Sequence, residues 1–107
     1  MSTNAIKPSS PPVRSQFADD PDFRELLEEF AAALPERRQS LIGAHHSEAY
    51  DDLRARAHQL KGAGGGFGFP RLSELAAELE QSCLSKDPIR IAAALEQLVE
   101  HMNRITV

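Results

Sequence analysis

The sequence predicts an all-α protein, an up-down antiparallel bundle of four helices with a flexible N-terminal tail. Over residues 21–107, apolar residues recur at spacings of three and four, the period of a helix that buries one face. Nowhere do apolar and polar residues alternate with period two, so no strand is expected. The breaks between the periodic segments are short, and short connections favour antiparallel neighbouring helices.

Length, charge and cysteine content exclude several classes of protein. The 107 residues suit one domain, and the net charge of -4 argues against a general nucleic-acid binder, whose binding surface would be basic. The single cysteine, Cys83, rules out an intramolecular disulfide and a cysteine-based zinc site. No apolar run approaches the ~20 residues that span a bilayer, and no apolar signal segment opens the chain. We therefore expect a cytoplasmic protein that acts without a membrane or nucleic acid.

Residues 1–20 are predicted to form a disordered tail, with the folded domain at residues 21–107. The tail holds three prolines and four serines, and its few apolar residues show no period. Such a segment buries too little apolar surface to offset the entropy cost of ordering it. A docking arm or tether is the alternative interpretation.

The first helix is predicted to begin at Asp20 and Pro21, a capping residue followed by a proline that suits the first helical position. Its apolar stripe consists of Phe23, Leu27, Phe30, Leu34, Leu41 and Ala44. Pro35 interrupts this stripe, so we expect one long kinked helix, or two collinear helices, up to about residue 46. Arg37 or Arg38 falls where an apolar residue is due.

Three further helices follow, each with a start signal and an apolar stripe. Ser47 is the expected N-cap of the second, Pro70 starts the third, and Asp87 with Pro88 starts the fourth. Gly68 suits a left-handed turn after the second helix. The three stripes are Leu53, Ala57, Leu60, Gly64 and Phe67; Leu72, Leu75, Ala76, Leu79 and Cys83; and Ile91, Leu95, Leu98, Met102 and Ile105. The glutamates of the third helix are expected to point outward: Glu74, Glu78 and Glu80.

Five of the six glycines lie between residues 62 and 68, close to one histidine. His58 stands about 100° around the helix from Ala57, which belongs to the buried stripe. The residues one or two turns away on the histidine's own face are Arg54, Lys61, Gly62 and Gly65. Two of these have no side chain, so the imidazole is expected to stand over a bare surface beside two cations. The arrangement suits a carrier that meets a bulky protein partner, with the cations holding an anion such as a phosphoryl group.

Helix phase divides the glycines by role. Gly64 falls on the packed stripe, where it permits the close approach of another helix. Gly62 and Gly65 fall on the face of the candidate histidine, where packing gives no reason for them. Gly66 and Gly68 help to end the helix.

Other kinds of chemistry lack the residues they need. The glycine run sits inside a helix pattern and lacks the Gly-Lys-Ser/Thr ending of a nucleotide-binding loop. No second histidine or carboxylate stands four residues from His58 for a metal site, and no Ser-His-Asp order is readable. A lone exposed histidine without a base or cofactor makes a poor enzyme but a fair phosphoryl carrier.

The pattern His58-x-Leu60-Lys61-Gly62-x5-Gly68, preceded by Ala57, resembles the signature of histidine-containing phosphotransfer (HPt) domains. The following Phe69-Pro70-Arg71-Leu72, continuing into a Leu/Glu helix, is also similar to that family, and Phe67-Gly68-Phe69 resembles the phosphotransfer domain of chemotaxis histidine kinases. The resemblance covers about residues 21–107. The sequence departs from the family where Ser47 and Ala49 replace an acidic residue and where Arg38 occupies a position that is commonly apolar.

The resemblance implies a four-helix bundle that carries a phosphohistidine intermediate in a phosphorelay. His58 would be phosphorylated, at Nε2, with Lys61 contacting the phosphoryl group and Gly62 and Gly68 giving room and closing the motif. The partners would be receiver domains of response regulators, with a hybrid sensor histidine kinase as a further candidate. The chain would need no cofactor or ATP site of its own, because Mg²⁺ would belong to the receiver. We expect it to be a monomer.

Two other functions remain open from the sequence. The first is an adaptor that keeps the fold and docks a receiver or kinase without transferring phosphate. The second is a small metal- or haem-binding bundle that would use some of the histidines: His45, His46, His58 and His101. Apart from His58, these are most simply read as solvent-exposed helix residues.

Overall fold

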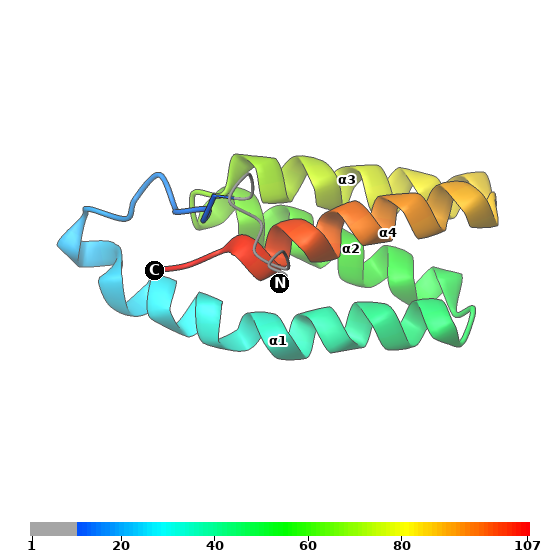
Figure 1. Cartoon of the computed structure of the whole chain (residues 1–107), viewed down its shortest axis with the longest axis horizontal. Coiled ribbons are helices and arrows are strands. Elements are labelled where there is room, and N and C mark those ends of the chain that lie inside the picture. Colours follow the sequence, from blue (N-terminus) through cyan, green and yellow to red (C-terminus); the bar gives the residue numbers. More distant parts are fainter. Residues whose placement is uncertain (1–10) are drawn as a thin grey trace, which may run out of the picture.

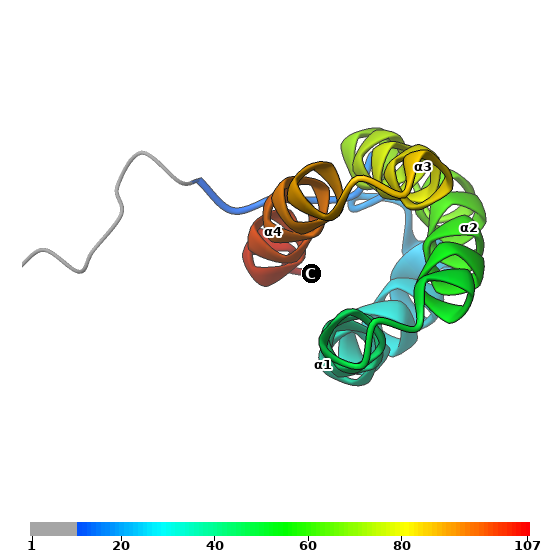
Figure 2. The same ribbon diagram turned by 90° about the vertical axis from the view of Figure 1, so that its right-hand side faces the viewer.

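The computed structural model describes residues 11–107, and its secondary structure over this range is helical apart from turns and an isolated bridge between Val13 and Ile105. A short 3-10 turn, η1 (Pro21–Phe23), leads into α1 (Arg24–His46), α2 (Tyr50–Gly66), α3 (Pro70–Ser85) and α4 (Pro88–Arg104). The helices run alternately up and down, and a view along them shows an open arc in the order α1, α2, α3, α4 (Figures 1 and 2). The predicted four-helix bundle is confirmed.

The core lies on the inner side of this arc and takes leucines from all four helices, among them Leu34, Leu53, Leu60, Leu72, Leu79 and Leu98. At one end, two phenylalanine rings stack on a third, that of Phe30. The Phe30 ring lies 4.8 Å from the Phe67 ring and 5.5 Å from the Phe69 ring, centroid to centroid. The most extensive helix contact is between α2 and α3, which together carry the candidate site.

Helix α1 is a single element that runs through Pro35, which lies on its exposed side. Leu41 and Ala44 are buried beyond the proline, as the spacing predicts. The predicted caps are also present: an Asp20 carboxylate oxygen accepts from the Asp22 amide, 2.9 Å, and that of Asp87 accepts from the Ile89 amide, 3.0 Å.

Ser47 does not cap α2, so that prediction is wrong. It ends α1 instead, and its amide donates to the Gly43 carbonyl, 3.0 Å. The reversal of the chain then uses Glu48 at a positive φ of 57°, and α2 begins only at Tyr50. Ser47 therefore lies at the end of the preceding helix and not at the start of the next one.

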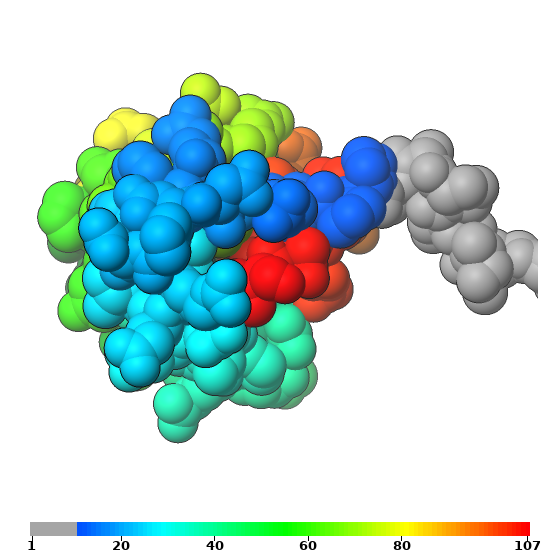
Figure 3. Space-filling view, turned by 90° about the vertical axis from the view of Figure 1, so that its left-hand side faces the viewer, coloured from blue at the N-terminus to red at the C-terminus, as the bar shows by residue number. Residues whose placement is uncertain are grey.

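Residues 11–20 pack on the bundle, contrary to the expected tail over residues 1–20; residues 1–10 lie outside the described residues. We call residues 11–20 the N-terminal strap. Val13 donates to the Arg104 carbonyl, 2.8 Å, and accepts from the Thr106 amide, 2.9 Å. The Ser15 hydroxyl donates to the Phe67 carbonyl, 2.6 Å. Figure 3 shows the strap in blue across this end of the molecule, beside the C-terminus in red. The packing of the strap was not predicted because separate hydrogen bonds to backbone groups produce no periodic pattern of residues in the sequence.

Gly68 is the residue of the α2–α3 turn against which Ser15 and Phe17 of the N-terminal strap pack. Its φ is +83°, and a Cβ there would lie 2.6 Å from the Ser15 Oγ and 2.8 Å from a Phe17 ring carbon. We expect Gly68→Ala to lower the free energy of unfolding by about 1–2 kcal/mol, the usual cost of the left-handed conformation, and to loosen the strap. Urea denaturation and amide hydrogen exchange at Val13 would measure both effects. The control is Gly66→Ala, where the Cβ meets nothing within 4 Å. Wild-type stability and protection in Gly68→Ala would contradict this role.

His101 was expected at the surface, but its residue is only 4% exposed, so that prediction is wrong. It follows Leu98 by three positions and therefore shares the buried side of α4. Burial lowers its pKa, and the nearby Arg104 and Arg71 lower it further, while Glu100 acts in the opposite direction.

This burial predicts that the fold weakens in mild acid. Below the ordinary histidine pKa near 6.5, the unfolded chain takes up a proton that folded His101 resists, so stability falls as the pH drops from about 6.5 toward the lowered value. We expect His101→Gln to flatten the decline of melting temperature between pH 7.5 and 5.5. The exposed His46→Gln should keep the full decline. An unchanged slope in His101→Gln would refute this assignment.

Candidate functional site

His58 projects from the middle of α2. Its neighbours Ala57 and Leu60 face the core and hold this part of the helix in place, while the His58 side chain is 64% exposed. The imidazole Nδ1 lies 2.9 Å from the Glu80 Oε2 on α3. One edge of the ring is therefore held by the neighbouring helix.

Glu80 joins His58 to Lys61. Its second oxygen, Oε1, lies 2.9 Å from the Lys61 Nζ, and the glutamate side chain is 14% exposed. The hydrogen bond from Lys61 is the main cause that lowers the pKa of Glu80; burial opposes it, and the bond with His58 adds to the lowering. Glu80 is therefore an ionised carboxylate at neutral pH.

The expectation that Glu80 points outward is wrong. Its position falls four residues after Ala76 and three before Cys83, two buried residues of α3, so it lies at the edge of the stripe that faces α2. The spacing of Glu80 from Ala76 and Cys83 could therefore have predicted that it lies near α2. The partner of the glutamate lies 22 positions earlier in the chain, and no local pattern connects the two.

The carboxylate also fixes the histidine tautomer. An ionised carboxylate only accepts hydrogen bonds, so the proton of the neutral ring must sit on the Nδ1 that faces Glu80. The Nε2 then keeps its lone pair on the other side of the exposed ring. The nucleophilic nitrogen, Nε2, thus faces outward. The Nδ1–H on the other side of the ring donates to the Glu80 carboxylate, which can stabilise positive charge that develops on the ring.

The glycines divide as predicted. A Cβ at Gly62 would meet nothing within 4 Å, and one at Gly65 would meet only the Ser73 Oγ, at 3.9 Å. Both glycines are exposed on α2 beside the histidine. Gly64 is buried, and a Cβ there would lie 3.1 Å from the backbone nitrogen of Ser73. The Ser73 hydroxyl donates to the Lys61 carbonyl, 2.8 Å, and links α3 to α2 beside the site.

Two of the predicted site residues, Arg54 and Gly68, are not exposed beside His58 as Gly62 and Gly65 are. Arg54 is half-buried one turn before His58, and within the described residues no carboxylate pairs with it. Gly68 is buried beneath Ser15 and Phe17 in the α2–α3 turn, so it does not belong to the exposed surface around the histidine. We therefore assign Gly68 to the turn between α2 and α3 and not to the surface that a receiver would contact.

Within residues 11–107, no group of three or more His, Cys, Asp or Glu side chains is placed to hold a metal ion. Burial raises the pKa of the Cys83 thiol, which belongs to the core. Among the helices of the same described range, none has the length and apolar character needed to cross a membrane.

Comparison with known proteins agrees with the geometry. The family model described as "Hpt domain" matches residues 25–105, which include nearly all of the four helices and the whole site. No curated protein and no solved structure matches the chain.

Proposed function

The chain belongs to the Hpt-domain family, which serves histidine phosphotransfer in phosphorelays, and we propose that its phosphoryl acceptor is His58. One observation carries this proposal. The Nδ1 of an exposed imidazole is bound to an ionised Glu80, which directs the opposite nitrogen, Nε2, away from the carboxylate on a surface cleared by Gly62 and Gly65.

The donor in this proposal is the phospho-aspartate of a receiver domain. The His58 Nε2 attacks the phosphorus, the N–P bond forms, and the bond from phosphorus to the aspartate oxygen breaks. The aspartate leaves as a carboxylate, and the ring carries a positive charge that the Glu80 carboxylate stabilises through Nδ1–H. Transfer to the next receiver runs the same step in reverse. Such a transfer depends mainly on position and electrostatics, which suits a site with few side chains.

Lys61 is proposed to contact the phosphoryl oxygens. Its ammonium group is 2.9 Å from Glu80 and belongs to the same exposed face as His58. A lysine is a flexible point charge, so it can turn from the carboxylate toward an incoming phosphoryl group. Arg54 is proposed as a second cation for the docked receiver, and the Mg²⁺ of the reaction as the receiver's own.

The proposal makes the chain a carrier without an ATP site, which receives its phosphoryl group from another protein. Receiver domains of response regulators are the proposed partners, with a hybrid sensor kinase as one source of the phosphoryl group. The bare surface at Gly62 and Gly65 supports this, because it lets the wall of a receiver's active site close over the ring.

The test is transfer from a phosphorylated receiver to the full chain. We expect label that is acid-labile and base-stable, as on a phosphohistidine, and mass spectrometry should place it on residue 58. Label at another residue would overturn the assignment. Measurable binding with no transfer from any receiver of the same genome would instead identify an adaptor.

Glu80→Gln tests the role of the carboxylate as a positioning residue. Gln can still occupy the space, but it carries no charge to stabilise the imidazolium, so we expect transfer to slow by about tenfold to hundredfold, as when a metal-bound histidine loses its hydrogen-bond partner. The ¹⁵N shifts of the ring should show a smaller share of the Nδ1–H tautomer. The matched control is Glu78→Gln, which removes the same charge from an exposed site beside Arg90. Unchanged ring shifts in Glu80→Gln would refute this role.

A further inference from the structure

Arg37 is a charged residue in a position suited to a core side chain. It lies on α1 between Leu34 and Leu41, which are 3% and 2% exposed, and it is itself half-buried. The phosphotransfer site on α2 and α3 makes no use of it. An arginine held in the seam between α1 and α2 therefore needs its own explanation.

The guanidinium group of Arg37 lacks a counter-ion. In the part of the chain that the structure describes, no carboxylate oxygen lies within 4.0 Å of it. Its neighbour is the ring of Phe30, 5.9 Å from the guanidinium carbon to the centroid. A cation over an aromatic face offsets part of the cost of desolvation, but a partly buried charge is normally paired with an anion.

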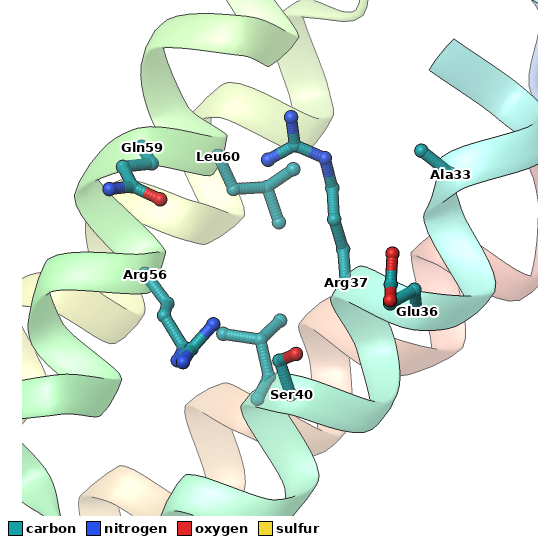
Figure 4. A pocket seen from close by; sticks show the side chains of 8 residues that line it. Ala33, Glu36, Arg37, Ser40, Arg56, Gln59 and Leu60 are labelled. Atoms are coloured by element: carbon teal, nitrogen blue, oxygen red, sulfur yellow. The ribbon is translucent and has the colours of Figure 1, made fainter. Parts of the chain in front are cut away.

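A groove of about 440 Å³ lies beside this charge, between α1 and α2. Figure 4 shows the Arg37 and Arg56 side chains reaching into it from opposite helices, with Ser40 and Gln59 at its sides. Its apolar lining residues are Ala33, Leu41 and Leu60, and the two leucines are almost fully buried beneath it. The volume falls in the range of small-molecule sites, and five of the eight lining residues are polar or charged, a lining that suits a charged ligand.

The charges of the groove favour an occupant with a single negative charge. Arg56 is already paired with Asp52, 2.9 Å, which leaves Arg37 as the cation without a partner. Glu36 also lines the groove, but it is exposed, and adjacent helix positions do not face each other, so it does not pair with Arg37. A guanidinium group binds a carboxylate through two parallel hydrogen bonds.

We propose that this groove binds a small organic carboxylate. The carboxylate would pair with Arg37, with Ser40 and Gln59 as further hydrogen-bond donors, and the rest of the molecule would lie beside Ala33. The lining covers residues 33–41 of α1, about 12 Å of helix, a length that suits a small molecule better than a peptide.

The groove is separate from the phosphotransfer site. Arg56 and Leu60 each stand two positions from His58, about 160° around α2, so the groove opens on the far side of that helix. Occupancy of the groove can therefore be measured without reference to phosphoryl transfer.

The test is a titration of the full chain with sodium benzoate, followed by the backbone amide shifts of residues 33–41 and 56–60. We expect saturable shifts there, with at least about tenfold weaker binding in Arg37→Gln. The matched control Arg38→Gln removes the same charge from a neighbouring position that does not line the groove, and it should bind as the wild type does. Benzamide, which lacks the charge, should leave these amides unmoved.

The proposal would be overturned by no saturable shift with benzoate in the wild type, by equal binding in Arg37→Gln, or by equal shifts with benzamide. Inorganic phosphate is titrated in parallel. A stronger response to phosphate than to benzoate would also overturn the assignment to a carboxylate. The melting temperature of Arg37→Gln shows whether the variant is folded, and removal of a half-buried unpaired charge should leave it folded.

Discussion

His58→Gln is expected to take up no phosphoryl group from a receiver that labels the wild-type chain. Glutamine keeps a polar side chain of similar size, but its amide nitrogen has no free lone pair with which to attack phosphorus. The side chain is 64% exposed, so its replacement should change the free energy of unfolding by no more than about 0.5 kcal/mol. Transfer would be measured as label retained on the chain, and folding by thermal denaturation.

The control for this loss is His46→Gln, which removes an exposed histidine from the end of α1. It should accept label at the wild-type rate. If His58→Gln accepted as much label as the wild type, the phosphoryl acceptor would have to be another residue. If it failed to fold, the loss of label would carry no weight, and Glu80→Gln with its ring-shift readout would remain as the independent test.

Gly64→Leu and Gly62→Leu are expected to fail in opposite ways. At Gly64 the first added carbon would already lie 3.1 Å from the backbone of Ser73, and the backbone of α3 cannot yield as a flexible side chain would. Overpacking of this kind costs about 1–3 kcal/mol, so the melting temperature should fall by roughly 5–20 °C for a domain of this size.

Gly62→Leu should instead leave the bundle as stable as the wild type, or more so. The position is open, and leucine is the better helix former by up to about 1 kcal/mol. The new side chain would stand beside His58 where the receiver must approach, so we expect transfer to slow at least about tenfold. Calorimetry and transfer from one phosphorylated receiver would be measured on both variants. Similar behaviour of the two would show that the glycines do not face in different directions.

The sequence predicts the bundle well because each helix carries its own period. Spacings of three and four placed the buried leucines, and they separated Gly64 from Gly62 by phase alone. The same argument put His58 on an exposed face. Each of these features depends on one helix at a time, and a helix turns by a fixed angle per residue.

Features that depend on two elements could not be found in this way. The contact of Glu80 with His58 requires the phase of α3 relative to α2, which the close approach at Gly64 determines. The strap depends on hydrogen bonds from Val13 and Ser15 to backbone groups more than 50 positions away, and a backbone partner has no sequence signal. His101 was misplaced for a simpler reason, because its polar character outweighed its position on the stripe.

The pairing of Val13 with Ile105 brings both ends of the described chain to one pole of the bundle. This pole is the one with the α2–α3 turn, whereas His58 lies near the middle of the long side. Whatever precedes residue 11 or follows residue 107, such as a tag or a further domain, would therefore leave from the same pole. A docked protein over His58 and an attachment at either end need not compete for space. Val13 and Ile105 are also close enough for a short linker to join the chain near them, so the order of the helices could be permuted without a long new connection.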